Sequence, residues 1–123
     1  MVMASEGLHE SPDLLRPETR DMHRALTSLM EELEAIDWYG QRVDVTGDPT
    51  LREILAHNRD EEQEHAAMVL EWIRRHDPDF DRHLREYLFT EGSIVRREAA
   101  IAERADTNGA RPAASVGSLR GNR

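Results

Sequence analysis

The sequence predicts an all-α fold in which an antiparallel two-helix hairpin is followed by a shorter C-terminal helix. Helix formers such as Leu, Ala, Glu, Arg and Met dominate the middle of the chain, and no run alternates β-branched with polar residues. Apolar residues in the first half recur at spacings of three and four, as in a coiled-coil seam. Between the two long apolar patterns, Asp48-Pro49 combines a helix N-cap with a proline at the first helical position.

The first helix is expected to run from near Leu14 to Trp38. Pro17 can occupy its first turn, where a missing N–H costs no hydrogen bond. Residues 40–50 contain two glycines and are therefore expected to form the connection to the second helix. The apolar seam of the first helix consists of Met22, Leu26, Leu29, Leu33 and Ile36.

The second helix is expected to run from Pro49 to about His76, because the Asp-Pro-Asp run that follows disfavours its continuation. A third helix is expected to begin near Asp79 or Phe80. Residues 93–105 are expected to form a further short helix.

The chain is expected to hold one helical domain, residues 14–97, between two extensions. Residues 1–13 are expected to be a disordered lead, and residues 98–123 a C-terminal extension that includes a small-residue linker. A single hairpin leaves most of each apolar stripe in water, whereas two hairpins close a four-helix bundle. A homodimer is therefore expected on burial grounds.

The composition excludes several classes of function. Residues 1–107 carry 13 of the 16 basic residues against all 25 acidic ones, a net charge of −12. Such a body is not expected to bind nucleic acid or an anionic membrane, but it can attract cations. The chain has no cysteine, no apolar run of membrane length and no signal-peptide core near its N-terminus. Thiolate chemistry is therefore excluded, and a cytoplasmic or shell-enclosed protein is expected.

The most informative residues are a carboxylate and an imidazole on an apolar face. On a helix that turns about 100° per residue, Glu62 and His65 fall within the apolar arc of the second helix. Glu32 lies at the margin of the apolar stripe of the first helix. A buried carboxylate without a partner is costly, and a metal ion can supply that partner. The apolar residues of the arc are Leu51, Ile54, Leu55, Val69, Trp72 and Ile73.

These three residues amount to half of a di-iron site. Four-helix di-iron carboxylate proteins use two lone Glu residues and two Glu-x-x-His motifs. One chain supplies a lone Glu32 and the motif of Glu62 and His65, so a symmetric dimer would supply four carboxylates and two imidazoles. Such a set suits two iron ions. The same spacing also occurs at Glu6 and His9, so the spacing alone has little specificity.

Several alternatives remain open at this point. Glu31, Glu34 and Asp37 form either a solvated face or an acidic access path for cations. Tyr39 is either a packing residue or a neighbour of the metal site. The chain as a whole is either an iron oxidase or a non-catalytic helical scaffold, an adaptor whose acidic face only binds cations. Zinc hydrolase chemistry is disfavoured because no His-Glu-x-x-His motif is present.

Three stretches resemble the encapsulated ferritins of bacteria and archaea, namely MEELEAIDWYGQRVD (30–44), ILAHNRDEEQEHAAMVLEWIRR (54–75) and YLFTEG (87–92). The resemblance implies a ferroxidase that oxidises Fe(II) to Fe(III) with O2 at a di-iron centre. It implies that this centre lies across a dimer interface in a ferritin-like four-helix bundle, and that dimers assemble into an annular decamer. By the same resemblance, Glu32, Glu62 and His65 are iron ligands, Tyr39 is near the centre, and Glu31 and Glu34 form a secondary metal site near Trp38.

The C-terminal stretch SVGSLR, residues 115–120, resembles the targeting peptides with which cargo proteins dock inside encapsulin shells. The resemblance therefore implies an iron-storage role inside an encapsulin nanocompartment, with the shell protein as partner. The residues implied in docking are Val116, Gly117, Ser118, Leu119 and Arg120.

Overall fold

The computed structural model describes residues 7–107 of the chain. These residues form helices and turns and contain no strand, which confirms the all-α class. The chain divides into two compact units, of which the first ends at His76 and the second begins at Asp77. In chain order the elements are η1 (Pro12–Leu14), α1 (Pro17–Val45), α2 (Pro49–His76), α3 (Pro78–Tyr87) and α4 (Ile94–Thr107).

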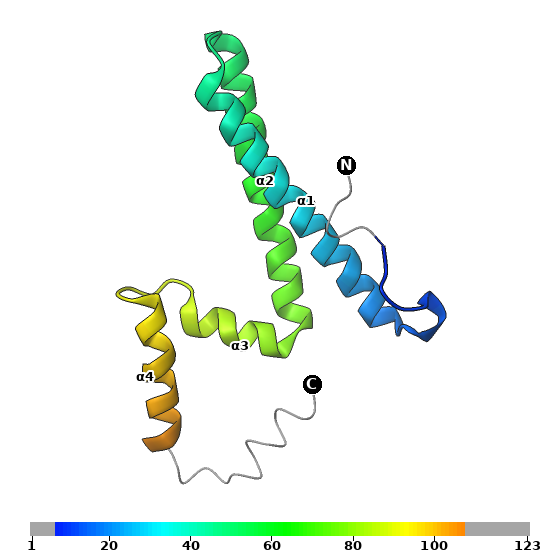
Figure 1. The fold of residues 1–123 in the computed structure, drawn as a ribbon, viewed down its shortest axis with the longest axis vertical. Coiled ribbons are helices and arrows are strands. Elements are labelled where there is room, and N and C mark those ends of the chain that lie inside the picture. Colours follow the sequence, from blue (N-terminus) through cyan, green and yellow to red (C-terminus); the bar gives the residue numbers. More distant parts are fainter. Residues whose placement is uncertain (1–6, 108–123) are drawn as a thin grey trace. The chain divides into compact units, whose positions relative to one another are not determined.

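Helices α1 and α2 form the predicted antiparallel hairpin (Figure 1). The connecting loop is short, residues 46–48, and its own side chains define where α2 begins. Asp48 is the N-cap of α2, since its Oδ2 accepts a hydrogen bond from Leu51 N at 2.8 Å. Arg52 Nε donates to Thr46 O at 2.9 Å, which ties the loop to the first turn of α2.

Helix α1 differs from its expected boundaries at both ends. It begins at Pro17 and continues through Gly40 to Val45, so the expectation that residues 40–50 form the connection was wrong. One glycine inside a helix costs only about 1 kcal/mol. The extra turns satisfy the backbone hydrogen bonds of residues 41–45 and keep them beside the start of α2, which outweighs that cost.

The buried core of the hairpin is small. Among the described residues, Ala66 and Ile73 are the buried hydrophobic side chains, and Ile73 is 0% exposed. Large apolar side chains of both helices remain exposed, including Leu26, Leu33 and Ile54. Contiguous exposed apolar surface marks interaction sites. The hairpin therefore has the face that a bundle-forming dimer requires, and the dimer itself remains a prediction.

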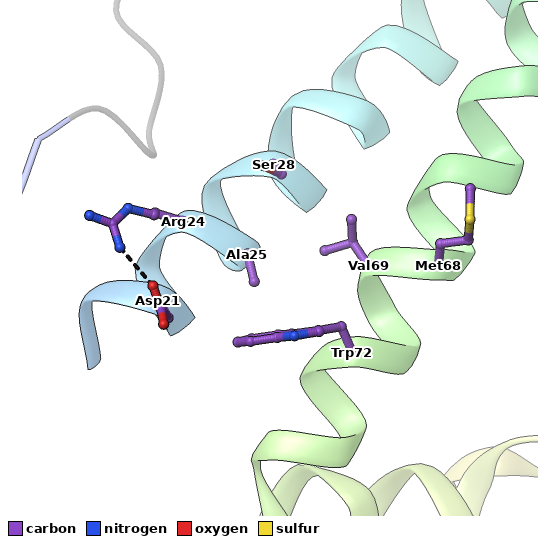
Figure 2. A pocket seen from close by; sticks show the side chains of 7 residues that line it. All are labelled: Asp21, Arg24, Ala25, Ser28, Met68, Val69 and Trp72. Atoms are coloured by element: carbon purple, nitrogen blue, oxygen red, sulfur yellow. Dashed lines mark hydrogen bonds and ion pairs between the residues drawn. The ribbon is translucent and has the colours of Figure 1, made fainter. Parts of the chain in front are cut away.

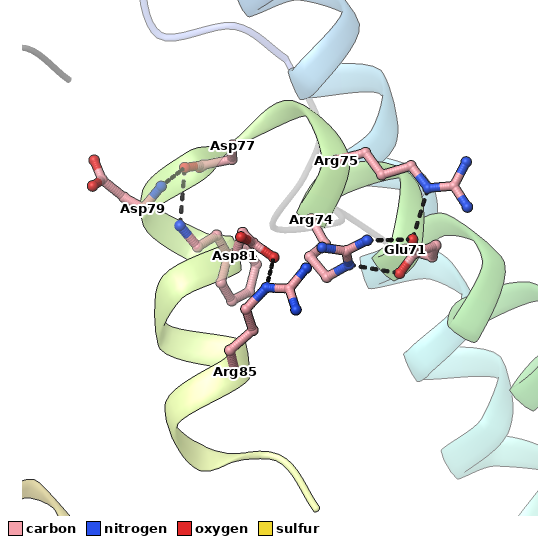
Figure 3. A network of polar contacts seen from close by, with 8 residues as sticks. Glu71, Arg74, Arg75, Asp77, Asp79, Asp81 and Arg85 are labelled. Carbon is pink, nitrogen blue, oxygen red and sulfur yellow. Dashed lines mark hydrogen bonds and ion pairs between the residues drawn. The ribbon is translucent and has the colours of Figure 1, made fainter. Parts of the chain in front are cut away.

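The last turn of α2 carries a three-residue ion network (Figure 3). Arg74 donates from Nε and Nη2 to the two oxygens of the Glu71 carboxylate, both at 2.8 Å, and Arg75 Nε donates to the same carboxylate at 2.7 Å. These hydrogen bonds lower the pKa of Glu71 to about 2. Two arginines near the helix C-terminus also interact favourably with the helix dipole.

The second unit begins with a capped helix. Asp77 is the N-cap of α3, because its Oδ1 accepts hydrogen bonds from Asp79 N at 3.1 Å and Phe80 N at 3.0 Å (Figure 3). Ser93 Oγ accepts from Arg96 N at 3.1 Å and caps α4 in the same way. The third helix and the further short helix that the sequence predicts are both present.

Two elements cross the domain limits that the sequence suggests. The short helix η1 crosses the expected limit between residues 13 and 14, and α4 crosses the expected limit between residues 97 and 98. The limits of the helical domain remain a prediction. Within residues 7–107, none of the helices has the length and apolar character needed to cross a membrane.

Candidate metal centre

Three ligand side chains meet between the two long helices. Glu32 comes from the middle of α1, and Glu62 and His65 come from α2. One ligand atom of each residue lies within 4.8 Å of those of the other two. Within the described part of the chain, no other set of three or more His, Cys, Asp or Glu side chains is placed to hold a metal ion. We call these three residues the ligand group.

The local sequence explains half of this geometry. Glu62 and His65 are three residues apart on α2, so both side chains leave the same face of the helix. Their closest atoms, Glu62 Oε1 and His65 Nδ1, are 3.3 Å apart. The hairpin supplies the other half, because antiparallel pairing across the short loop brings Glu32 opposite them.

The environment of Glu32 would be stabilised by a bound cation. Its Oε1 atom is buried and has no hydrogen-bond partner among the described residues. Burial raises the pKa of the Glu32 carboxyl, the negative charge of Glu62 raises it further, His65 opposes this, and Glu31 adds a smaller increase. A bound cation would compensate both the lost hydration and the repulsion between the two carboxylates. The ligand group therefore fits a metal ion.

The donor set indicates the class of metal. Two carboxylates and one imidazole suit first-row transition metals such as iron, manganese and zinc. Three donors from one chain leave at least one coordination position open on any of these ions. The group can hold a metal ion by itself or form half of a larger site, and the half-site across a dimer stays a prediction.

The two acidic residues expected at a secondary site do not join the ligand group. Glu31 is exposed and Glu34 is half-buried, both on α1. Trp38, which is expected beside them, lines a shallow pocket of about 310 Å³ together with Gln41 and Arg42.

Tyr39 is half-buried, and the Arg42 guanidinium lies 5.5 Å from the centroid of its ring. Arg42 is not among the residues that the sequence predicts at a site. The spacing of three residues on one helix face was the signal that could have found it. The proposed docking residues 115–120 lie outside the described part of the chain.

An open groove of about 400 Å³ lies between α1 and α2, beginning one turn beyond His65 (Figure 2). The Trp72 ring points across this groove toward α1, and His76 stacks on Trp72 with ring centroids 3.9 Å apart. The face that carries the metal ligands thus continues into an open groove whose α2 side is apolar and whose α1 side carries the Asp21–Arg24 ion pair. The residues that line the groove are Asp21, Arg24, Ala25, Ser28, Met68, Val69 and Trp72.

Comparison with known proteins shows the family to which the chain belongs. A family model described as EncFtn-like matches residues 7–91, which include the ligand group and helices α1 to α3. The chain belongs to the EncFtn-like family. The resemblance to encapsulated ferritins noted in the sequence is thereby confirmed.

Three known proteins are similar to this chain in sequence. An encapsulated ferritin-like protein of Rhodospirillum rubrum is 60% identical over 100 residues, which cover 81% of this chain and 71% of that protein. A ferritin-like protein of Thermotoga maritima is 52% identical over 105 residues, covering 85% and 92% respectively. The encapsulin nanocompartment cargo protein EncC of Myxococcus xanthus is 37% identical over 100 residues, covering 72% and 76%.

A solved structure confirms that the EncFtn-like fold is shared. The crystal structure of protein ne0167 from Nitrosomonas europaea superposes with a TM-score of 0.70 at 62% sequence identity. The match covers 72% of this chain and 98% of that one. The family model ends at residue 91, so α4 lies beyond the part of the chain that it matches.

Proposed function

We propose that this chain is a ferroxidase that takes Fe(II) as its substrate, transfers electrons to O2, and supplies Fe(III) for storage inside an encapsulin shell. The observation that carries the proposal is the ligand group, and in particular the buried, unpartnered oxygen of Glu32. The names of the relatives, an encapsulated ferritin-like protein and an encapsulin cargo protein, support the same role.

The residues of the ligand group have distinct parts in this proposal. Glu32 and Glu62 supply negative charge, which favours Fe(III) over Fe(II) and so helps the iron to lose an electron. His65 adds a neutral donor that completes the coordination without further charge. A second copy of the chain supplies the same three residues, so a symmetric dimer would hold two iron ions side by side.

The surface around the ligand group supports the dimeric site. The groove beside Trp72 and the exposed apolar residues of α1 and α2 lie on the hairpin, where a second hairpin would cover them. Assembly of such dimers into an annular decamer is part of the same proposal and follows the resemblance. An open ring cannot enclose a mineral, so the shell would provide the storage volume.

The outer acidic residues fit an auxiliary role. We place Glu31 and Glu34 near Trp38 on the access path of iron, where carboxylates collect cations before they reach the ligand group. Tyr39, under the Arg42 guanidinium, is proposed as a neighbour of the centre. Deleting the carboxylates of Glu31 and Glu34 should slow iron uptake without abolishing oxidation.

The test is Fe(II) oxidation in air by the purified full-length chain. We expect rapid oxidation that is lost in Glu62→Ala and His65→Ala. Glu64→Ala is the matched control, since Glu64 is an exposed carboxylate of the same helix outside the ligand group, and its variant should oxidise iron normally. Oxidation no faster than in buffer, together with higher stability of Glu62→Leu, would favour the adaptor interpretation instead.

The docking role has a separate test. Deleting residues 115–123 should abolish loading into the encapsulin shell and leave iron oxidation unchanged. Loss of oxidation in this deletion would show that the tail has another role.

A further inference from the structure

The turn between α3 and α4 exposes an apolar surface that the proposed function does not use. Phe89 is fully exposed, Leu88 is exposed, and the first two residues of α4, Ile94 and Val95, are 70% and 80% exposed. We call these four residues the turn patch. Single exposed apolar residues are ordinary, but four large ones within eight positions form a surface for contact.

Phe89 is held in this surface at a conformational cost. Its φ is 59°, and Leu88 before it has φ −74° and ψ 148°. These values are typical of the central positions of a type II turn, in which the second position is usually glycine. Thr90 Oγ1 donates to Tyr87 O at 2.7 Å and closes the turn. Backbone strain combined with a ring in water points to a contact that compensates both.

The sequence beyond α4 contains a segment of matching chemistry. Residues 108–123 include two large apolar side chains, Val116 and Leu119, and three arginines without any acidic residue. We propose that the turn patch binds this segment of its own chain, with Val116 and Leu119 against Phe89. The turn patch belongs to the unit that begins at Asp77, and residues 108–123 follow it in the chain.

Chain length permits the contact. Helix α4 spans about 20 Å from Ile94 to Thr107. The nine residues from Thr107 to Val116 reach about 30 Å when extended, and about 17 Å on average for a flexible chain. A tether of this length gives an effective concentration in the millimolar range. A contact with a dissociation constant of about 1 mM would therefore be populated about half of the time.

Charge favours the same partner. Residues 108–123, the tail, carry three arginines and no acidic side chain, whereas residues 1–107 carry 25 acidic residues against 13 arginines. Glu91 lies in the turn itself, and Glu98 lies one helical turn from Ile94. Arg96 and Arg97 are also nearby and stay positively charged, although Arg97 Nε donates to the Glu86 carbonyl at the end of α3. Acidic side chains are thus available beside the patch for the arginines of the tail.

The contact would regulate docking. A segment held on the turn patch is not available to a shell protein, so loading would require its release. This consequence rests on the proposed docking role of residues 115–120, whereas the contact itself does not. Its test therefore uses neither iron nor shell, and its failure leaves the ferroxidase proposal standing.

The chain offers a direct measurement, because it has two phenylalanines and no cysteine. The full-length protein is labelled with 4-fluorophenylalanine, which gives one fluorine signal each for Phe80 and Phe89. A nitroxide is attached at Ser118→Cys. We expect the Phe89 signal to broaden several-fold more than the Phe80 signal, and to recover when ascorbate reduces the nitroxide. Phe89→Gly assigns the signal and suits the positive φ, so the turn should survive this change.

Two controls make the outcome decisive. Changing Val116 and Leu119 to Ser should remove the selective broadening of Phe89; equal broadening of both signals, or broadening that ignores these changes, would overturn the proposal. Diluting the labelled chain tenfold with unlabelled chain before assembly should leave the broadening unchanged. A fall on dilution would show that the patch contacts a second copy, which would also overturn it.

Discussion

Glu32→Gln tests whether the Glu32 carboxylate destabilises the fold without metal and stabilises it when metal is bound. In the metal-free protein the Glu32 carboxylate has a buried, unpartnered oxygen and a like charge at Glu62. An unpaired buried polar group costs about 1–3 kcal/mol. Gln keeps the shape and removes the charge but leaves an amide, so we expect a gain near the lower limit, about 1 kcal/mol. For a domain of about 100 residues, this raises the melting temperature by about 4–8 °C.

With metal bound, wild type should be more stable than Glu32→Gln. Wild-type protein saturated at 100 times its dissociation constant gains about 2.7 kcal/mol. The Gln variant lacks one carboxylate ligand and should gain much less. The assay is thermal unfolding at fixed protein concentration, with and without Co²⁺ or Zn²⁺, which bind such ligands without reacting with O2 under these conditions. Glu64→Gln is the control and should follow wild type in both conditions.

Acid should remove the difference in the metal-free protein. Since the folded-state pKa of Glu32 is raised above its unfolded value of 4.5, its favourable contribution is complete below that value and is lost as the pH rises through the folded pKa. The variant should therefore be more stable at neutral pH and equal to wild type in acid. The reasoning would be refuted by a metal-free variant that is less stable than wild type at neutral pH, or by equal gains from metal.

Three further predictions concern the fold. Ile73→Ala should lower the free energy of unfolding by about 2–5 kcal/mol, because Ile73 is fully buried, whereas the exposed Val45→Ala should change it by less than about 0.5 kcal/mol in a denaturant titration. Asp77→Ala should cost about 1 kcal/mol through loss of the α3 cap; an unchanged melting temperature would contradict this role. In the wild type, the hydrogen bonds that lower the pKa of Glu71 stabilise the fold above pH 4.5, and this stability is lost as the pH falls through the folded pKa of about 2. Glu71→Gln should therefore reduce the loss of stability between pH 4.5 and about 2 in an acid titration. An acid profile that matches wild type would show that the arginine pairs contribute nothing.

The sequence by itself determined the elements whose signals are local. The start of α2 follows from Asp48 and Pro49, and its end from the Asp-Pro-Asp run after His76. Helical periodicity places Glu62 and His65 on the same face of α2 as its apolar residues, because residues three or four positions apart lie on one face of a helix. The candidate ligands and the family resemblance could therefore both be predicted from the sequence.

The tertiary structure decided the register between the helices. Glu32 and Glu62 are equally far along the chain from Gly47, the middle residue of the loop. A connection at residues 40–50, as expected from Gly40, would instead have placed Asn58 opposite Glu32. The local preference of one glycine was too weak to end α1 against the gain from continued pairing with α2, and this non-local balance cannot be read from helical periodicity.

The tertiary structure also decided which polar and apolar groups lack partners. The burial of Glu32 Oε1 depends on atoms of both helices, and the exposure of Phe89 depends on a turn at a position where glycine is usual. Burial is a property of packing between segments, whereas a sequence pattern specifies only the face on which a residue lies. The expectation of a metal ion at Glu32, Glu62 and His65 came from the sequence, whereas the unpartnered Glu32 Oε1 atom and the exposed turn patch became visible only in the folded chain.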